Sequence, residues 1–184
     1  MNNSILDRYS RLDDKRIIID VTANRVEDLY NNFDQNAPYI KKDLNTALAE
    51  YLVESVSEIG KVPFVISFRF QSPADPGLYQ RVKDSVSQYF IYMQQLQKHK
   101  LTRMLRTSFI YLLAGLVILV LSFIFNRRLP DTDSVFAHIL AEGLIIAAWV
   151  SLWEALANLL IHWTPLKRLL DIYRRIASAE VIFV

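Results

Sequence analysis

The chain has 184 residues, a formal net charge of +2 and no cysteine. This small charge is not the basic surplus that nucleic-acid binding requires, so no nucleic-acid partner is expected. The lack of cysteine excludes disulfides, thiolate metal sites and a cysteine nucleophile. Apolar residues make up 52% of the chain and charged residues 22%, which predicts that the two kinds are segregated along the sequence.

The first part of the chain begins with a polar segment and a strand pattern. Residues 1–15 are polar and lack the apolar stretch of a signal peptide, so we expect a polar tail. The β-branched run at residues 16–22 predicts a buried strand. Residues 24–32 then favour a short helical turn.

A helix and a second strand follow. Asp43 is the expected N-cap of a helix that ends at Ile59, with Gly60 as its stop. Residues 62–70 alternate between apolar and smaller or polar side chains, which predicts a strand with one strongly apolar face. The residues of that face are Val62, Phe64, Ile66, Phe68 and Phe70.

A long helix is expected after a turn at residues 71–77. Neither proline nor glycine occurs from Leu78 to Ala114, so nothing in the sequence breaks a helix over this stretch. The helix can therefore run from a soluble domain, residues 16–100, directly into the first of two apolar segments.

The two apolar segments, at about 108–126 and 136–163, are the most informative feature of the chain. The first has no charge over about 18 residues, close to the ~20 that cross a ~30 Å hydrocarbon core at 1.5 Å per residue. Together they predict a transmembrane hairpin within residues 101–165. The alternative is a buried hairpin of a soluble protein, but uncharged runs of this length are uncommon in globular helices.

Basic residues lie at the two outer ends of this hairpin. They are Lys98, Lys100, Arg103 and Arg106 before the first segment, and Lys167, Arg168, Arg174 and Arg175 after the second. In the connection at residues 126–135, Arg127 and Arg128 are balanced by Asp131 and Asp133. The positive-inside rule then predicts cytoplasmic N- and C-termini and an external loop.

The last part of the chain, residues 166–184, is expected to return to the soluble domain. Residues 166–177 have the pattern of a basic amphipathic helix at the membrane interface, and residues 180–184 are strand-like. We place this last strand beside the first two. The predicted fold class is α+β: a small cytoplasmic sheet-and-helix domain with an inserted two-helix transmembrane hairpin.

Polar residues form two stripes along the second apolar segment. His138 and Glu142 share one helical face, and the second stripe consists of Ser151, Glu154, Asn158 and His162. A carboxylate in hydrocarbon is costly unless it is neutral, paired or turned toward protein or water. In the first segment, small and hydroxyl residues share a face that allows close helix approach. These residues are Ser108, Tyr111, Gly115, Ser122 and Asn126.

Two interpretations of the glutamates are open. Glu142 and Glu154 hold spans together by hydrogen bonds, within or between subunits, or they line an ion or proton path. The second interpretation requires an oligomer, because one two-span subunit cannot enclose a pore.

No catalytic or cofactor site is expected. His138 and Glu142 have the helical spacing of metal ligands, but two candidate ligands are too few for a metal site. The four glycines form no phosphate-binding loop, and neither a GxSxG elbow nor an HExxH motif occurs. We therefore expect a protein that is not an enzyme and has no cofactor.

One distinctive block is EGLIIAAWVSLWEAL at residues 142–156, and further stretches of the same kind are residues 163–165 and 173–176 and, upstream, 26–34, 37–39, 43–44 and 50–53. In these stretches the chain resembles a family of uncharacterised bacterial inner-membrane proteins. The acidic and tryptophan residues that follow the block in other members are replaced here around Asn158 and residues 162–165. The resemblance implies a topology and a bacterial cytoplasmic membrane, but no activity.

These observations favour a non-enzymatic, multi-pass protein of the bacterial cytoplasmic membrane. Its expected partners are the lipid bilayer, further copies of the same chain and other membrane-protein subunits. It would act as a homo-oligomeric scaffold or as an accessory subunit of a membrane complex. The alternative is an oligomeric ion or proton channel, or a transporter component, that uses Glu142 and Glu154.

Overall fold

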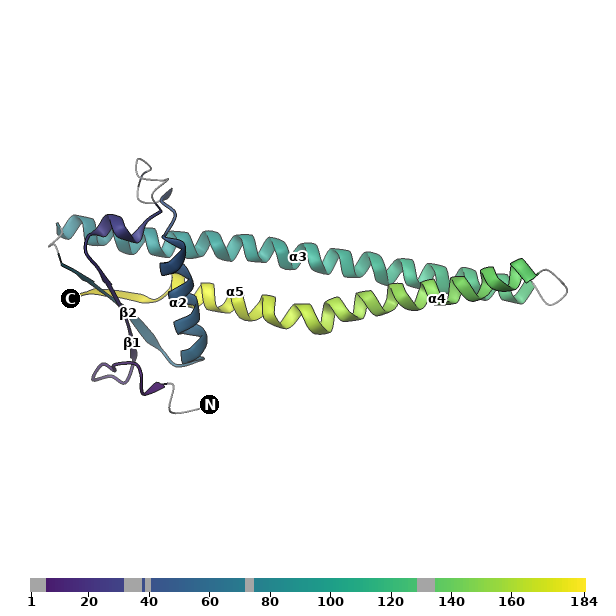
Figure 1. Ribbon diagram of the computed structural model, residues 1–184, viewed down its shortest axis with the longest axis horizontal. Coiled ribbons are helices and arrows are strands. Elements are labelled where there is room, and N and C mark those ends of the chain that lie inside the picture. Colours follow the sequence, from purple (N-terminus) through teal and green to yellow (C-terminus); the bar gives the residue numbers. More distant parts are fainter. Residues whose placement is uncertain (1–5, 32–37, 39–40, 72–74, 129–134) are drawn as a thin grey trace. The chain divides into compact units, whose positions relative to one another are not determined.

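The computed structural model describes residues 6–31, 38, 41–71, 75–128 and 135–184 (Figure 1). The chain divides into two compact units. Unit 1 comprises Met1–Leu96 and Leu169–Val184, and unit 2 comprises Gln97–Arg168. Parts of the predicted tail, of the turn at residues 71–77 and of the loop with Asp131 and Asp133 lie outside the described residues.

Unit 1 contains a three-stranded parallel sheet of β1 (Ile17–Ala23), β2 (Phe64–Phe70) and β3 (Glu180–Phe183), in the order β1-β2-β3. All three strands were predicted from sequence. The expectation of a single apolar face on β2 was too narrow, because Val65 and Ser67 on the opposite face are also buried. A central strand of a parallel sheet is typically covered on both faces.

The predicted return of the chain to the sheet is confirmed by β3. This strand pairs with β2, with Ile66 opposite Val181 and Phe68 opposite Phe183 (Figure 1, β3 in yellow). Adjacent parallel strands need a crossover connection between them. Here that connection contains all of unit 2, so unit 2 is an insertion between two neighbouring strands.

The first helices of unit 1 are the short η1 (Val26–Leu29) and α2 (Thr46–Ile59). The prediction of Asp43 as the N-cap of α2 was wrong. Leu44 is buried and forms an extended bridge to Tyr30, so the helix begins later. The N-cap is Asn45, whose side-chain oxygen accepts a hydrogen bond of 2.9 Å from the Ala47 N–H.

The C-terminal stop of α2 agrees with the prediction. Gly60 has a φ of 69°, and its N–H donates to the Val56 carbonyl at 3.2 Å. Glycine adopts this left-handed backbone region without the steric cost that a Cβ brings.

The core of unit 1 lies between the sheet and three helices. The predicted long helix is α3 (Pro76–Arg128), which begins two residues before Leu78 and has 53 residues. Pro76 suits the first turn, where its missing N–H has no helical partner to lose. Completely covered core side chains come from α2, the sheet and α3: Leu52, Val56, Ile59, Ile19, Ile66, Phe68, Val82 and Phe90.

The last helix, α5 (Trp163–Ala177), adds Ile172 and Ile176 to this core. It begins three residues before the predicted start. Its Arg175 donates to the carbonyls of Gly60 and Val62, the latter at 2.7 Å. Burial lowers the pKa of this guanidinium, which lies over the ring of Phe64. Arg175, predicted from sequence to be a membrane-flanking charge, therefore ties α5 to the turn between α2 and β2.

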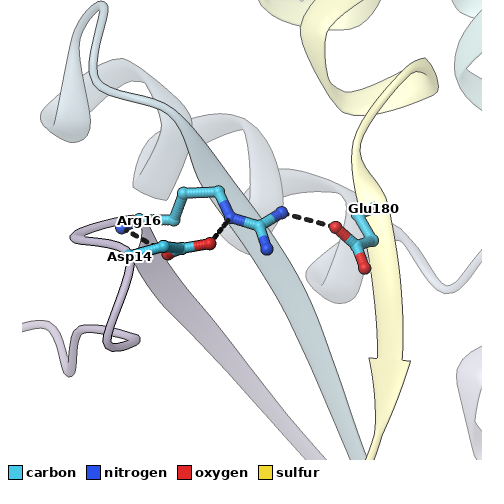
Figure 2. A network of polar contacts seen from close by, with 3 residues as sticks. All are labelled: Asp14, Arg16 and Glu180. Atoms are coloured by element: carbon cyan, nitrogen blue, oxygen red, sulfur yellow. Dashed lines mark hydrogen bonds and ion pairs between the residues drawn. The ribbon is translucent and has the colours of Figure 1, made fainter.

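A small ion cluster joins the starts of the two outer strands (Figure 2). Arg16 reaches Asp14 at 2.6 Å on one side and pairs with Glu180 on the other. The pKa of Asp14 is lowered because the backbone N–H and the guanidinium of Arg16 both donate to its carboxylate. These groups are solvent-exposed, so the cluster orients the strand ends more than it stabilises the sheet.

Candidate functional site

Two helical stretches, Gly77–Arg127 and His138–Ala177, are long and apolar enough to cross a membrane by length and composition. Only 17% and 11% of their most apolar windows are buried. A core helix of a soluble protein would be mostly covered. The exposed large apolar side chains include Phe109, Val117, Phe123, Val150, Trp153 and Leu160.

Small residues at seven-residue intervals form the seam between α3 and α4 (Val135–Ala157). On α3 they are Ser108, Gly115 and Ser122, and on α4 they are Ala141, Ala148 and Ala155; all six are buried. A seven-residue spacing keeps these positions facing the partner helix along the whole hairpin. Ser108, Gly115 and Ser122 belong to the face of the first segment that was predicted from sequence, but Tyr111 of that face is exposed. The alanines of α4 were missed.

Gly115 shows how closely the two helices approach. A Cβ atom added there would lie 2.8 Å from the Leu152 Cγ and 3.2 Å from the Ala148 carbonyl oxygen. Because the helices of a hairpin run antiparallel, pairing Gly115 with Ala148 sets Ser108 level with Ala155 and Ser122 level with Ala141. Small residues along a helix interface permit this short separation between backbones.

The predicted site residues lie outside this seam. The side chains of His138, Glu142, Glu154 and His162 are exposed, and those of Ser151 and Asn158 are partly buried. Asn158 donates to the Glu154 carboxylate at 3.4 Å, and Ser151 donates to the Ala147 carbonyl at 3.0 Å. Both hydrogen bonds join residues four apart along the same helical stretch, and neither reaches α3.

Among the described contacts within the chain, Glu154 therefore forms no hydrogen bond to α3, so these contacts do not support its expected role in holding the two spans of one chain together. Ser108 instead donates to the Met104 carbonyl at 2.9 Å. The reason is geometric, since Ala155 occupies the seam and its neighbour Glu154 is turned about 100° away from it. A contact between Glu154 and a neighbouring subunit stays a prediction.

The two glutamates lie on opposite sides of the seam. Glu142 follows Ala141 and Glu154 precedes Ala155, so the helix turns them in opposite directions from the alanine row. Their separation along α4 is about 18 Å, because twelve residues each rise 1.5 Å. One continuous path on one face of α4 cannot include both carboxylates.

A π-helical turn, η4 (Asn158–His162), separates α4 from α5. No residue pattern in the sequence signalled it. Such turns widen the helix, leave its regular hydrogen-bond ladder and occur frequently at functional sites. It contains two of the predicted site residues, Asn158 and His162.

Metal ligands do not gather in the part of the chain that the structure describes. Within it, no three side chains of the histidine, aspartate and glutamate type come together as a metal site would require. Among the described residues, His138 and Glu142 therefore have no third ligand beside them with which to form a metal site.

No family model, curated protein or solved structure matches the chain. The resemblance to the bacterial inner-membrane family thus stays a prediction.

Proposed function

We propose that the chain is a two-span protein of the bacterial cytoplasmic membrane that assembles with copies of itself. In this proposal it is not an enzyme, and it serves as a scaffold or as an accessory subunit of a membrane complex. The observation that carries the proposal is the position of Glu154. It lies on an exposed flank of an apolar helix, beside the two further polar side chains Ser151 and Asn158.

Exposure of this polar flank to hydrocarbon is costly, and self-assembly would cover it. The α3–α4 seam is lined by buried small residues, and at Gly115 a single added Cβ would already lie 2.8 Å from the Leu152 Cγ. Glu154 lies within the apolar segment at residues 136–163, and ionisable groups in such segments usually face protein or water. The flank of Ser151, Glu154 and Asn158 therefore suits a contact with a second copy, where it is withdrawn from lipid.

The channel or transporter alternative receives less support. It needs Glu142 and Glu154 along one path, whereas they lie on opposite sides of the α4 seam. An oligomer could place only one of the two carboxylates at a common axis. A scaffold held together by the Glu154 flank needs no such path.

The topology is tested with reporter fusions. The basic residues at both outer ends of the hairpin predict cytoplasmic N- and C-termini and an external loop. A reporter active only in the cytoplasm is expected to work when fused after Val184, and one active only outside should work when inserted between residues 128 and 135. External activity of a fusion after Val184 would overturn the topology.

Assembly is tested by two substitutions at Glu154. Glu154→Gln keeps a hydrogen-bonding group, so the oligomer is expected to persist. Glu154→Leu removes it and should weaken association by about 0.6–2 kcal/mol for each interhelical hydrogen bond lost. Native mass spectrometry and dilution series of the full chain in detergent measure this difference.

The same pair of substitutions at Glu142 is the matched control. Glu142 lies on the opposite flank of α4, six residues or about 9 Å along the helix from Phe136, the first residue of the apolar segment. Its carboxylate can therefore reach the membrane–water interface. Both Glu142 variants are expected to leave the oligomer unchanged. Reconstituted ion flux that disappears in Glu154→Gln while the oligomer keeps its size would favour the channel instead.

A further inference from the structure

A groove on unit 2 lies between α3 and the π-helical turn η4. We name it the basic groove and define it by its lining residues, Lys100, Arg103, Met104, Thr107 and Asn158. Its volume is about 320 Å³, within the size range of sites for small ligands. Four of its five side chains are polar, and two of these carry a positive charge.

The chemistry of the basic groove suits a phosphate group. Lys100 and Arg103 form no ion pair with any carboxylate among the described residues. The Asn158 amide has two N–H groups and donates one of them to Glu154, which leaves the second for a ligand. Thr107 adds a hydroxyl donor, so the lining supplies two cations and two neutral donors, the groups that bind an anion.

The position of the groove points to lipid as the source of that phosphate. Lys100, Arg103 and Thr107 follow one face of α3, and the uncharged stretch begins at the next residue, Ser108. Directly beyond it, Phe109 and Leu112 are exposed and could lie against acyl chains. This step rests on the proposed insertion of the hairpin into a membrane.

We propose that the basic groove binds the phosphate of an anionic lipid headgroup, such as phosphatidylglycerol. Basic pockets between membrane helices on the cytoplasmic side bind anionic headgroups by this chemistry. The π-helical turn gives the groove its neutral wall, because Asn158 is the first residue of η4. A lipid held there would fix α3 to η4 at the inner boundary of the hairpin.

The test measures lipid retention by the purified full chain. Native mass spectrometry in detergent compares added phosphatidylglycerol with phosphatidylcholine. The double variant Lys100→Gln/Arg103→Gln should lose affinity for phosphatidylglycerol by about 100-fold, since each charged hydrogen bond to the phosphate inside the groove contributes roughly tenfold or more. Lys98→Gln/Arg106→Gln removes the same charge from the same helix outside the groove, and it should retain the lipid.

A third variant separates a built site from general surface charge. Thr107→Val keeps the shape and the net charge but removes one donor, and it should weaken retention by about threefold to tenfold. Equal losses in both double variants, with none in Thr107→Val, would overturn the proposal. Inorganic phosphate that displaces the lipid and binds equally well alone would assign the groove to a soluble anion instead.

Alkaline carbonate extraction distinguishes this inference from the proposed function. Release of the chain from membranes by carbonate would contradict the membrane proposal itself. A chain that stays embedded, assembles and shows no preference for phosphatidylglycerol would contradict only the lipid site.

Discussion

Removal of residues 181–184 is expected to destabilise unit 1 by about 3–5 kcal/mol, a large part of the stability of a small domain. The deletion removes Phe183, whose ring lies 4.4 Å from that of Tyr79 and 6.0 Å from that of Phe68. It also removes the strand partners of Ile66, Ser67 and Phe68 in β2. Buried backbone groups without partners add to the loss of apolar contacts.

Limited proteolysis and thermal unfolding of the full-length and shortened chains measure this effect. The shortened chain should be cleaved rapidly within residues 41–71 under conditions where the full chain resists. Removal of Val184 alone is the control, because its side chain is 68% exposed. That variant loses little more than the N–H donated to Phe68. Identical cleavage and melting of all three chains would show that β3 does not hold unit 1 together.

Gly115→Leu is expected to separate α3 from α4, with a cost of about 1–3 kcal/mol to the hairpin from overpacking. The new side chain meets Leu152 and the Ala148 carbonyl, and a backbone carbonyl cannot move away as a side-chain end can. Gly143→Leu is the matched control. No atom lies within 4 Å of a Cβ added at Gly143, so that variant should leave the seam intact.

The natural absence of cysteine allows a direct measurement of this separation. Cysteines introduced at Ser122 and Ala141, which lie level across the seam, should form a disulfide readily in the otherwise unchanged chain and in Gly143→Leu. The rate should fall in Gly115→Leu, because a disulfide requires Cα atoms within about 7 Å. Equal rates in both variants would mean that the seam tolerates a large side chain.

The strands and helices were predictable because their signals are local. The β-branched run before Thr22, the unbroken stretch after Leu78 and Gly60 as a stop each depend on a few neighbouring residues. The prediction of the N-cap of α2 was wrong, because the pairing of Leu44 with Tyr30 is a tertiary contact that no local pattern reveals. Arg175 was misread for the same reason, since its carbonyl partners lie more than 110 residues away.

The sequence indicated candidate polar residues in the second apolar segment but not their geometry. Sequence spacing showed that Glu142 and Glu154 belong to different stripes, yet it could not say which face of α4 meets α3. Alanine is common on every kind of helix surface, so the row of Ala141, Ala148 and Ala155 carried no distinct signal. Only the seam fixes the two carboxylates on opposite flanks.

The insertion of unit 2 between β2 and β3 has a consequence for synthesis. The ribosome makes residues 71–179 after β2 and before β3, which takes roughly 5–20 s at about 5–20 residues per second. Throughout that interval β2 has one open edge, and an open apolar edge invites pairing with other chains. The hairpin is complete before this edge closes, so in the proposed membrane topology a nascent chain would reach the bilayer while its sheet is still unfinished.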